Sequence, residues 1–240
     1  MRILRKMIPL YALTLLAAAA AALLASRGIT VLAQVMGPAP VPPLPTVVLD
    51  PGHGGEDGGA VSETGIKESA INLEIGLRTR DLLEFLGFSV VMTRQTDISI
   101  FSPEAKTVSE KKISDLKNRV RLTEEAGHAL LLSIHQNKFS QSKYSGAQVF
   151  YAPTAGSREL AETLQAVFGR EVDPGNRRQA KQSESVYLLN QISCPGVIVE
   201  CGFLSNPEEA ARLRTADHQR VLAAAICAGL SRALAEEDLT

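Results

Sequence analysis

The sequence contains little cysteine, which limits how far disulfide bonds could hold the protein together. Three cysteines occur among 240 residues, and an odd number leaves at least one thiol unpaired within the chain. Cys194 and Cys201 flank the strand-like stretch PGVIVE, so seven extended residues would hold them about 20 Å apart, beyond disulfide reach. The sequence therefore argues against a disulfide framework and predicts free thiols that pack as small hydrophobic side chains.

An excess of positive charge is also missing. The formal net charge is −1, and residues 1–33 carry four basic side chains and no acidic one, so removing this +4 leaves −5 for the remainder. Proteins that bind nucleic acid usually present a basic surface. An acidic body therefore argues against nucleic acid as a partner, and a hydrophobic share of 45% indicates an ordinary globular domain.

Charged residues are absent from Ile8 to Ala25, directly after a short basic N-terminus. This run exceeds the apolar region of a cleaved signal, about 7 to 15 residues, and approaches the roughly 20 residues of a membrane-spanning helix. Val31-Leu32-Ala33 provides a small-residue cleavage site. We predict that residues 1–33 are a signal peptide or a membrane anchor, and that the rest is exported to the cell envelope, membrane-anchored or secreted.

A proline-rich stretch follows, with five prolines between Gln34 and Pro45. Such a composition favours a stiff, extended tether. Beyond it, the sequence shows neither an internal repeat nor a second shift in composition. We predict a linker at residues 34–45 and a single folded domain at residues 46–240.

Within that domain, short apolar runs alternate with segments of helical periodicity. Several runs lack polar alternation, which is typical of strands buried on both faces. The predicted strands are Val47–Leu49, Val90–Met92, Ala129–Ile134, Val149–Tyr151, Tyr187–Leu189 and Val197–Val199. The predicted helices are one from Glu68 that stops at Gly87, then Ile113–Ala126, Ser157–Phe168, Pro207–Leu213 and His218–Leu234. This pattern predicts an α/β fold, a mostly parallel, mixed sheet of about six strands with helices on both faces.

Two of the four histidines are expected at the same edge of that sheet. His53 follows the first strand in the glycine-rich stretch VVLDPGHGGEDGGA, and His135 ends the run ALLLSIH. The carboxyl ends of parallel strands meet at one edge, where ligand crevices form. His128 lies about 20 Å from His135 along the strand, and His218 lies at a helix start, so neither is expected to share the site.

Carboxylates near these histidines could complete a metal site. Two histidines and one carboxylate with an open position are typical of catalytic zinc. Spacing alone leaves the carboxylate open among Glu56, Asp57, Glu63 and Glu68. The first turn of a helix would hold Glu68 most rigidly. Glu200 ends the apolar strand VIVE, where a charged side chain needs a partner or a function.

Five motifs occur in order: LDPGHGGEDGGA, GIKESAINLEIG, TRQTD, LSIHQN and VIVECGFLSNPEE. Together they resemble the zinc-dependent N-acetylmuramoyl-L-alanine amidases of bacterial cell walls, over about Val47 to Leu234. The resemblance implies hydrolysis of the amide between N-acetylmuramic acid and L-alanine in peptidoglycan. It also implies Zn²⁺ ligands at His53, Glu68 and His135. The catalytic glutamate of the family falls on Glu200.

The segments GAQVFY, RQAK, YLL and VIVECGFLSN are most similar to the sporulation branch of this family. Members of that branch strip peptide from muramic acid so that a lactam can form in spore cortex. In a spore former, this similarity implies a location between the forespore membranes. Gln136 departs from the family pattern, which more often has a small residue there. The sequence shows no wall-binding repeat, so an activating partner would be a separate protein.

Other polar residues could support the site. Asp50 and Ser133 are the nearest polar candidates for orienting the imidazoles, and Asn137 could face substrate. Arginine suits bidentate contact with carboxylates. Candidates for stem-peptide contacts are Arg94, Arg119 and Arg178. Two alternatives stay open: a zinc peptidase that cuts within wall peptides, and a catalytically silent wall-binding module.

Overall fold

The computed structural model describes residues 22–25 and 43–236 of the chain. Residues 22–25 are helical, and the folded unit begins at Leu44. The predicted signal or anchor therefore lies outside the described residues except for that short helical stretch, as does most of the predicted linker. No helix within the described ranges is long and apolar enough to span a membrane. The assignment of residues 1–33 stays a prediction.

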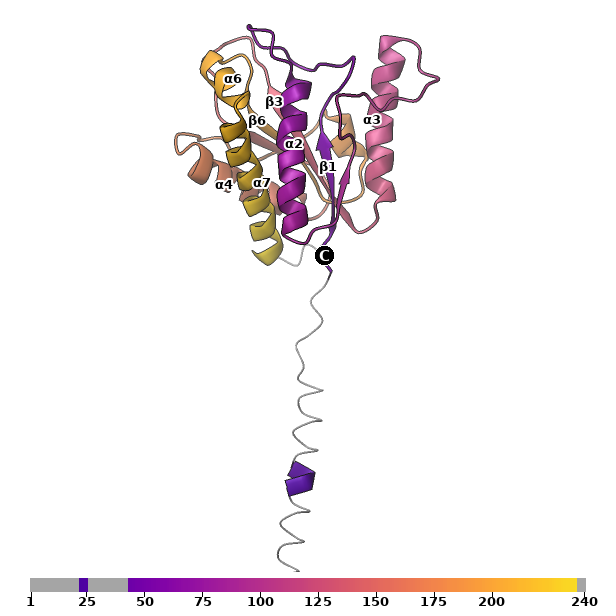
Figure 1. Cartoon of the computed structure of the whole chain (residues 1–240), viewed down its shortest axis with the longest axis vertical. Coiled ribbons are helices and arrows are strands. Elements are labelled where there is room, and N and C mark those ends of the chain that lie inside the picture. The colour runs from indigo at the N-terminus through magenta and orange to yellow at the C-terminus, as the bar shows by residue number, and fades with distance from the viewer. Residues whose placement is uncertain (1–21, 26–42, 237–240) are drawn as a thin grey trace, which may run out of the picture. The chain divides into compact units, whose positions relative to one another are not determined.

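Six strands form one mixed sheet in the folded unit (Figure 1). They are β1 (Thr46–Pro51), β2 (Val90–Met92), β3 (Ala129–Asn137), β4 (Gln148–Tyr151), β5 (Lys181–Gln182) and β6 (Gly196–Phe203). Their order across the sheet is β2-β1-β3-β6-β4-β5. The first four strands of that order are parallel, β4 pairs antiparallel with β6, and β5 runs parallel to β4. The predicted fold class is confirmed.

The sixth strand is not the one that the sequence predicted. Tyr187–Leu189 belongs to a short helix, α5 (Tyr187–Gln191), and the sixth strand is β5, whose two residues are both exposed. Leu188 and Leu189 are buried against the sheet. A short apolar run fits one buried helical turn as well as a buried strand, which is why periodicity assigned it wrongly.

Between residues 43 and 236, six α-helices and one π-helical turn accompany the sheet. The elements besides α5 are α2 (Glu68–Phe85), α3 (Val108–Glu125), α4 (Ser157–Val167), the π-helical turn Phe168–Val172, α6 (Pro207–Leu213) and α7 (Ala216–Glu236). α3 begins five residues before its predicted start, because Thr107 and Glu110 form a capping box. α6 has its predicted bounds, since the Asn206 side chain accepts from the first-turn backbone N–H groups.

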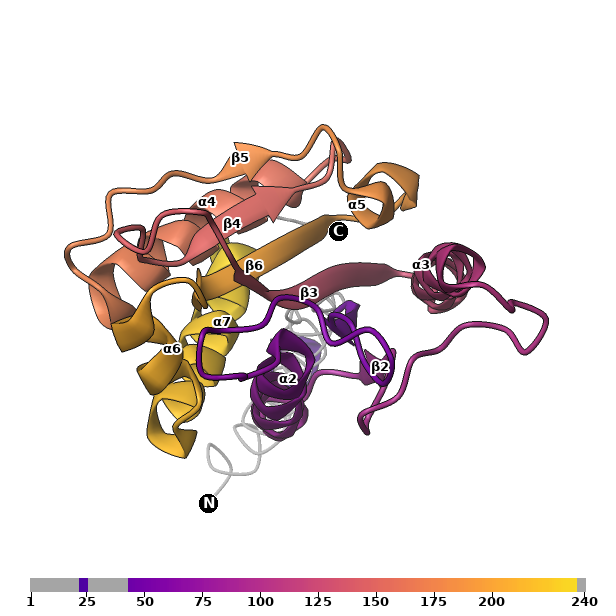
Figure 2. The ribbon, with the colours of Figure 1, turned by 90° about the horizontal axis from the view of Figure 1, so that it is seen from above.

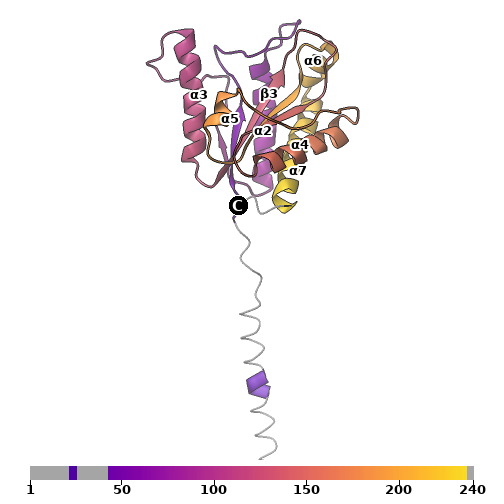
Figure 3. The ribbon, with the colours of Figure 1, turned by 180° about the vertical axis from the view of Figure 1, so that it is seen from behind.

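Alternate residues of the central strands pack into two separate hydrophobic clusters. In β1, Val47 and Leu49 belong to the cluster that contains residues of α2, α4 and α7, whereas Val48 belongs to the cluster with α3 and α5. Figures 1 and 2 show α2 and α7 side by side on one face, and Figure 3 shows α5 over the opposite face. Helices thus cover both faces, as predicted, and the central parallel strands β1, β3 and β6 are mostly buried on both sides, whereas β2 at the edge is partly exposed.

The three cysteines are free thiols in the described structure. Cys201 and Cys227 are buried in the cluster of α2, α4 and α7, and Cys194 is half-buried beside the other cluster. Burial raises the pKa of the Cys194 thiol to about 11 and that of Cys227 to about 12. The predicted packing role without a disulfide is confirmed.

Candidate metal centre

Three side chains predicted as metal ligands lie together at the carboxyl edge of the parallel strands. His53 comes from the loop after β1, Glu68 is the first residue of α2, and His135 lies near the end of β3. Each offers one nitrogen or oxygen atom, and these atoms lie within 4.8 Å of one another. The two imidazole rings meet edge-on, with centroids 5.0 Å apart. Two imidazoles and one carboxylate form a donor set that can hold a divalent metal ion.

The Glu68 carboxylate is buried, with 3% exposure, and is held by three donors besides the imidazoles. Its Oε1 accepts from the backbone N–H of Gln136 at 3.0 Å and from Asn72 Nδ2 at 3.3 Å, and its Oε2 accepts from the backbone N–H of Ala60 at 2.8 Å. Burial alone would raise the Glu68 pKa, but hydrogen bonds to both imidazoles outweigh it and hold the pKa well below its usual range. The group is therefore a fixed carboxylate.

His53 is oriented by a second carboxylate. Its Nδ1 lies 2.9 Å from Asp57 Oδ2, and its Nε2 lies 3.3 Å from Glu68 Oε2. Burial lowers the His53 pKa, yet the bonds to Asp57 and Glu68 outweigh that effect and raise it to about 9. Asp57, one of the open ligand candidates, thus occupies the orienting position that carboxylates often take behind a ligating histidine.

Glycines make room for this cluster. A Cβ on Gly52 would overlap the His135 ring, and a Cβ on Gly59 would lie 2.6 Å from Glu68 Oε2 and 2.7 Å from His53 Cδ2. Gly59 also has a φ of +67°, which side chains disfavour. At Gly52 and Gly59 the backbone therefore approaches the three side chains too closely to leave room for a Cβ atom.

Glu200 lies on β6 beside the cluster. Its Cα is paired in register with His135 of β3 and with Gln148 of β4. Its Oε2 atom is buried and has no hydrogen-bond partner among the described protein groups. Burial and the nearby Glu68 carboxylate raise the Glu200 pKa to about 7, although His135 opposes the shift. A carboxyl group with a pKa near neutrality can both accept and return a proton.

Asp50 and Ser133 do not contact either imidazole in the described hydrogen-bond network. Asp50 accepts instead from Ser133 Oγ at 2.6 Å, from Thr93 Oγ1 at 2.7 Å and from Arg119. Burial alone would raise the Asp50 pKa, but these donors lower it to about 2. Arg119 also donates to the carbonyl oxygen of His53 at 2.8 Å. Asp50 therefore supports the loop that carries His53 through a buried ion pair.

Arg94 supports the same loop through hydrogen bonds to its backbone. It is 2% exposed, and it donates to the carbonyl oxygens of Pro51 at 2.8 Å, Gly52 at 3.0 Å and Ser69 at 2.7 Å. The structure thus ties the guanidinium groups of Arg94 and Arg119 to the interior. Two other predicted residues, Asn137 and Arg178, are half-buried and line a common groove.

Sequence reasoning missed Asn72. Its Nδ2 donates to Glu68 Oε1 and also to the Gly52 carbonyl oxygen at 3.1 Å, and its Oδ1 accepts from Gln136 Nε2 at 3.1 Å. The available signal was position, because Asn72 lies one turn after Glu68 on the same helix face. Gln136, noted only as a departure from the family pattern, fixes the direction of the Asn72 amide.

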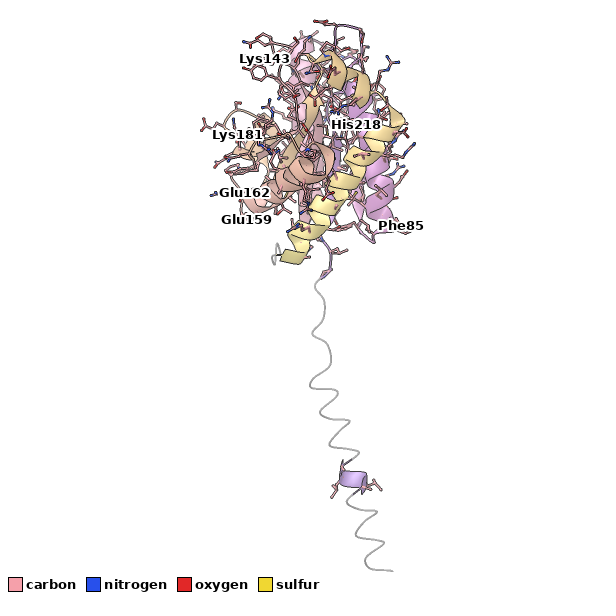
Figure 4. All side chains as sticks on the ribbon, turned by 90° about the vertical axis from the view of Figure 1, so that its left-hand side faces the viewer. Phe85, Lys143, Glu159, Glu162, Lys181 and His218 are labelled. Atoms are coloured by element: carbon pink, nitrogen blue, oxygen red, sulfur yellow. The ribbon has the colours of Figure 1, made fainter. Side chains whose placement is uncertain are left out.

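The two histidines excluded by sequence lie outside the cluster. The group of described residues that could hold a metal ion contains neither His128 nor His218. His128 precedes β3 at the opposite end from His135, and His218 lies on α7 (Figure 4). Position along a strand was sufficient to exclude His128, and position at a helix start was sufficient to exclude His218.

Comparisons with known proteins show which family the sequence and the fold resemble. The family model described as N-acetylmuramoyl-L-alanine amidase (Amidase_3) matches residues 47–232. The germination-specific N-acetylmuramoyl-L-alanine amidase of Bacillus subtilis is 38% identical over 192 residues, which are 80% of this chain and 80% of that protein.

Solved structures show the same fold. The CwlD amidase from Clostridioides difficile, in complex with the GerS lipoprotein, has a TM-score of 0.78 and 39% identity, over 81% of this chain and 100% of that one. The amidase AmiC2 of Nostoc punctiforme has a TM-score of 0.69 and 29% identity, over 79% of this chain and 97% of that one. The chain belongs to the Amidase_3 family of N-acetylmuramoyl-L-alanine amidases.

Proposed function

We propose that this amidase depends on Zn²⁺, held by His53, Glu68 and His135, and that Glu200 is its catalytic glutamate. The proposal rests on one arrangement of side chains. Two imidazoles and a carboxylate offer ligand atoms within 4.8 Å of one another, and Glu200, which has a buried oxygen without a hydrogen-bond partner, is paired in register with His135. The donor set fits a catalytic zinc site, in which three protein ligands leave a position open. The bond cleaved is the amide between the lactyl group of N-acetylmuramic acid and L-alanine.

Glu200 would act as the proton carrier of this hydrolysis. When bound, Zn²⁺ supplies Lewis-acid chemistry that favours attack of water on the amide carbonyl. The ionised Glu200 carboxylate accepts a proton from the attacking water. It then returns that proton to the alanine nitrogen as the carbon–nitrogen bond breaks. The products are a lactyl carboxylic acid and an amine, and the acid then releases its proton to the amine or to solvent. A pKa near neutrality suits both transfers.

The residues around the cluster would keep the ligands in place. Asp57 holds the His53 ring through Nδ1, and Asn72 holds Glu68 from the next turn of α2. Such outer partners fix the orientation and tautomer of metal ligands. The buried Asp50–Arg119 pair fixes the backbone of His53 in turn.

The biological role that we propose is modification of spore-cortex peptidoglycan. The relative from Bacillus subtilis is named as germination-specific, and it matches 80% of this chain. We further propose that residues 1–33 direct the protein to the cell envelope, as a signal peptide or membrane anchor. Because the CwlD amidase was solved in complex with a lipoprotein, a separate protein partner is part of the proposal for this chain.

Product analysis tests this proposal. Full-length protein with Zn²⁺ is incubated with purified peptidoglycan, and the released ends are identified by mass spectrometry. Wild type should release peptides with a new N-terminal L-alanine and leave peptide-free glycan, whereas Glu200→Gln should not. Glu208→Gln, at an exposed position on α6, is the matched control and should behave as wild type.

Two results would contradict the proposal. New amino termini within the peptide would indicate a zinc peptidase. Absence of any release by wild type, with and without a cortex-associated lipoprotein partner and despite bound zinc, would indicate a silent wall-binding module.

A further inference from the structure

A groove with a volume of about 300 Å³ lies beside the strand that carries Glu200. Four aromatic side chains line it, among them Tyr144 and Phe203. Its other lining residues are the amides of Asn137 and Gln148 and the cations of Arg178 and Lys181. No acidic side chain is among the residues that line it, so the groove presents apolar surface and positive charge together.

The groove continues the candidate metal centre across the sheet. The Cα atoms of His135, Glu200 and Gln148 are paired in register on three adjacent strands, β3, β6 and β4. Directly paired residues point to the same face of a sheet, and two strand spacings amount to about 10 Å. A straight row thus leads from a metal ligand through the catalytic glutamate to the groove.

Arg178 is held in place and retains hydrogen-bonding capacity. Its guanidinium lies 4.6 Å above the ring of Phe203, its Nε donates to the Ser145 carbonyl oxygen at 2.9 Å, and its Nη1 donates to Gln148 Oε1 at 3.4 Å. These two bonds use two of the five N–H donors of a guanidinium. A preoriented cation with donors left over is suited to a carboxylate.

A buried carboxylate connects the two chain segments that border the groove. Glu209, which is 7% exposed, accepts from the backbone N–H of Gly146 at 3.0 Å and from that of Phe203 at 2.8 Å. It therefore links the end of β6 to the loop that carries Tyr144 and Ser145. Hydrogen bonds within the protein thus fix the shape of the groove, and its lining side chains carry positive charge only.

We propose that this groove binds the peptide side of the substrate, and that Arg178 recognises a carboxylate two or three residues beyond the scissile amide. This inference rests on the proposed function, because it takes the amide to lie between the zinc ligands and Glu200. An extended peptide advances about 3.3 Å per residue, so two or three residues cover the row to Gln148. The glycan strand is an uncharged alternative, and the two cations favour the acidic peptide.

Binding measurements separate these occupants. The probes are N-acetylmuramoyl-L-alanyl-D-glutamyl-diaminopimelate and the same compound with its peptide carboxylates converted to amides. Isothermal titration uses full-length zinc-loaded protein carrying Glu200→Gln, so that neither probe is hydrolysed. Arg178→Gln should weaken binding of the acidic probe by roughly tenfold and leave that of the amidated probe unchanged. Arg177→Gln, the exposed neighbour in the same loop, should leave both unchanged.

Equal weakening of both probes by Arg178→Gln, or no weakening of either, would overturn the inference. Weaker binding of an uncharged N-acetylglucosamine disaccharide would overturn it too, because that result would assign the groove to glycan. Should Arg178→Gln fail to fold by circular dichroism, Lys181→Gln provides the same comparison. Hydrolysis by wild type is measured separately. Arginine-dependent binding without hydrolysis would uphold the groove and refute the proposed function. Hydrolysis of both probes with the same KM would uphold the proposed function and refute the role of the groove.

Discussion

Replacing Asp50 with asparagine should destabilise the folded domain by about 2 to 3 kcal/mol at neutral pH. Asp50 is fully buried and forms an ion pair with Arg119, whose side chain is 3% exposed. Removing one partner of a buried pair leaves an uncompensated charge, although Arg119 keeps its second bond to Asp115 at 2.6 Å. The lowered pKa gives a similar magnitude, since a shift from 3.8 to about 2 corresponds to about 2 kcal/mol.

The pH dependence of this loss distinguishes a charge effect from a packing effect. Because the folded-state pKa of Asp50 is depressed, its contribution is present above the unfolded value of 3.8 and disappears as pH falls towards about 2. Urea unfolding of metal-free wild type and Asp50→Asn is compared at pH about 7 and about 2.5. The difference in unfolding free energy should shrink at the lower pH.

A surface pair provides the control for this experiment. Asp217, whose side chain is 90% exposed, pairs with Arg220 on α7, and Asp217→Asn should cause no measurable change. A loss for Asp50→Asn that is equal at both pH values would show that shape, not charge, determines its contribution. A loss below about 1 kcal/mol at neutral pH would refute the buried-pair reasoning.

Three further predictions concern the metal centre. Asn72→Ala should weaken Zn²⁺ binding by about 10- to 100-fold, measured by competition with a chelator, because Glu68 loses its hydrogen-bond donor from the next helical turn. The control Asn190→Ala, on α5, should leave Zn²⁺ binding unchanged. Gly59→Ala should abolish stoichiometric zinc binding, measured by elemental analysis, while the circular dichroism spectrum stays native, since its Cβ would lie 2.6 Å from a ligand oxygen. Wild-type kcat/KM should fall as pH drops through a value at or below about 7, because Glu200 must be ionised to accept a proton. A bound cation favours the ionised form of Glu200 and so moves this value down. A kcat/KM unchanged down to pH about 5 would contradict the role of Glu200 as base.

Local signals in the sequence were sufficient for most of the fold. The apolar runs predicted the four parallel strands. The helix predicted at Pro207–Leu213 has those bounds in the structure, because the cap Asn206 and the proline after it act on their own helical turn. The same reasoning predicted that His53 and His135 converge, because the carboxyl ends of neighbouring parallel strands must meet. The prediction of a strand at Tyr187–Leu189 was wrong, because three apolar residues are too few to show whether the hydrophobic period is that of a helix or of a strand.

The partners of each side chain were decided only in three dimensions. Spacing left four acids open as the third ligand, and the fold places Glu68 beside both imidazoles while Asp57 orients one of them. Arg119 reaches backbone and carboxylate groups 66 to 69 residues away in the chain, so no local pattern could distinguish it from a surface arginine. Caps and periodicity are encoded by residues within a few positions of one another, whereas buried polar contacts depend on which strands and helices pack together.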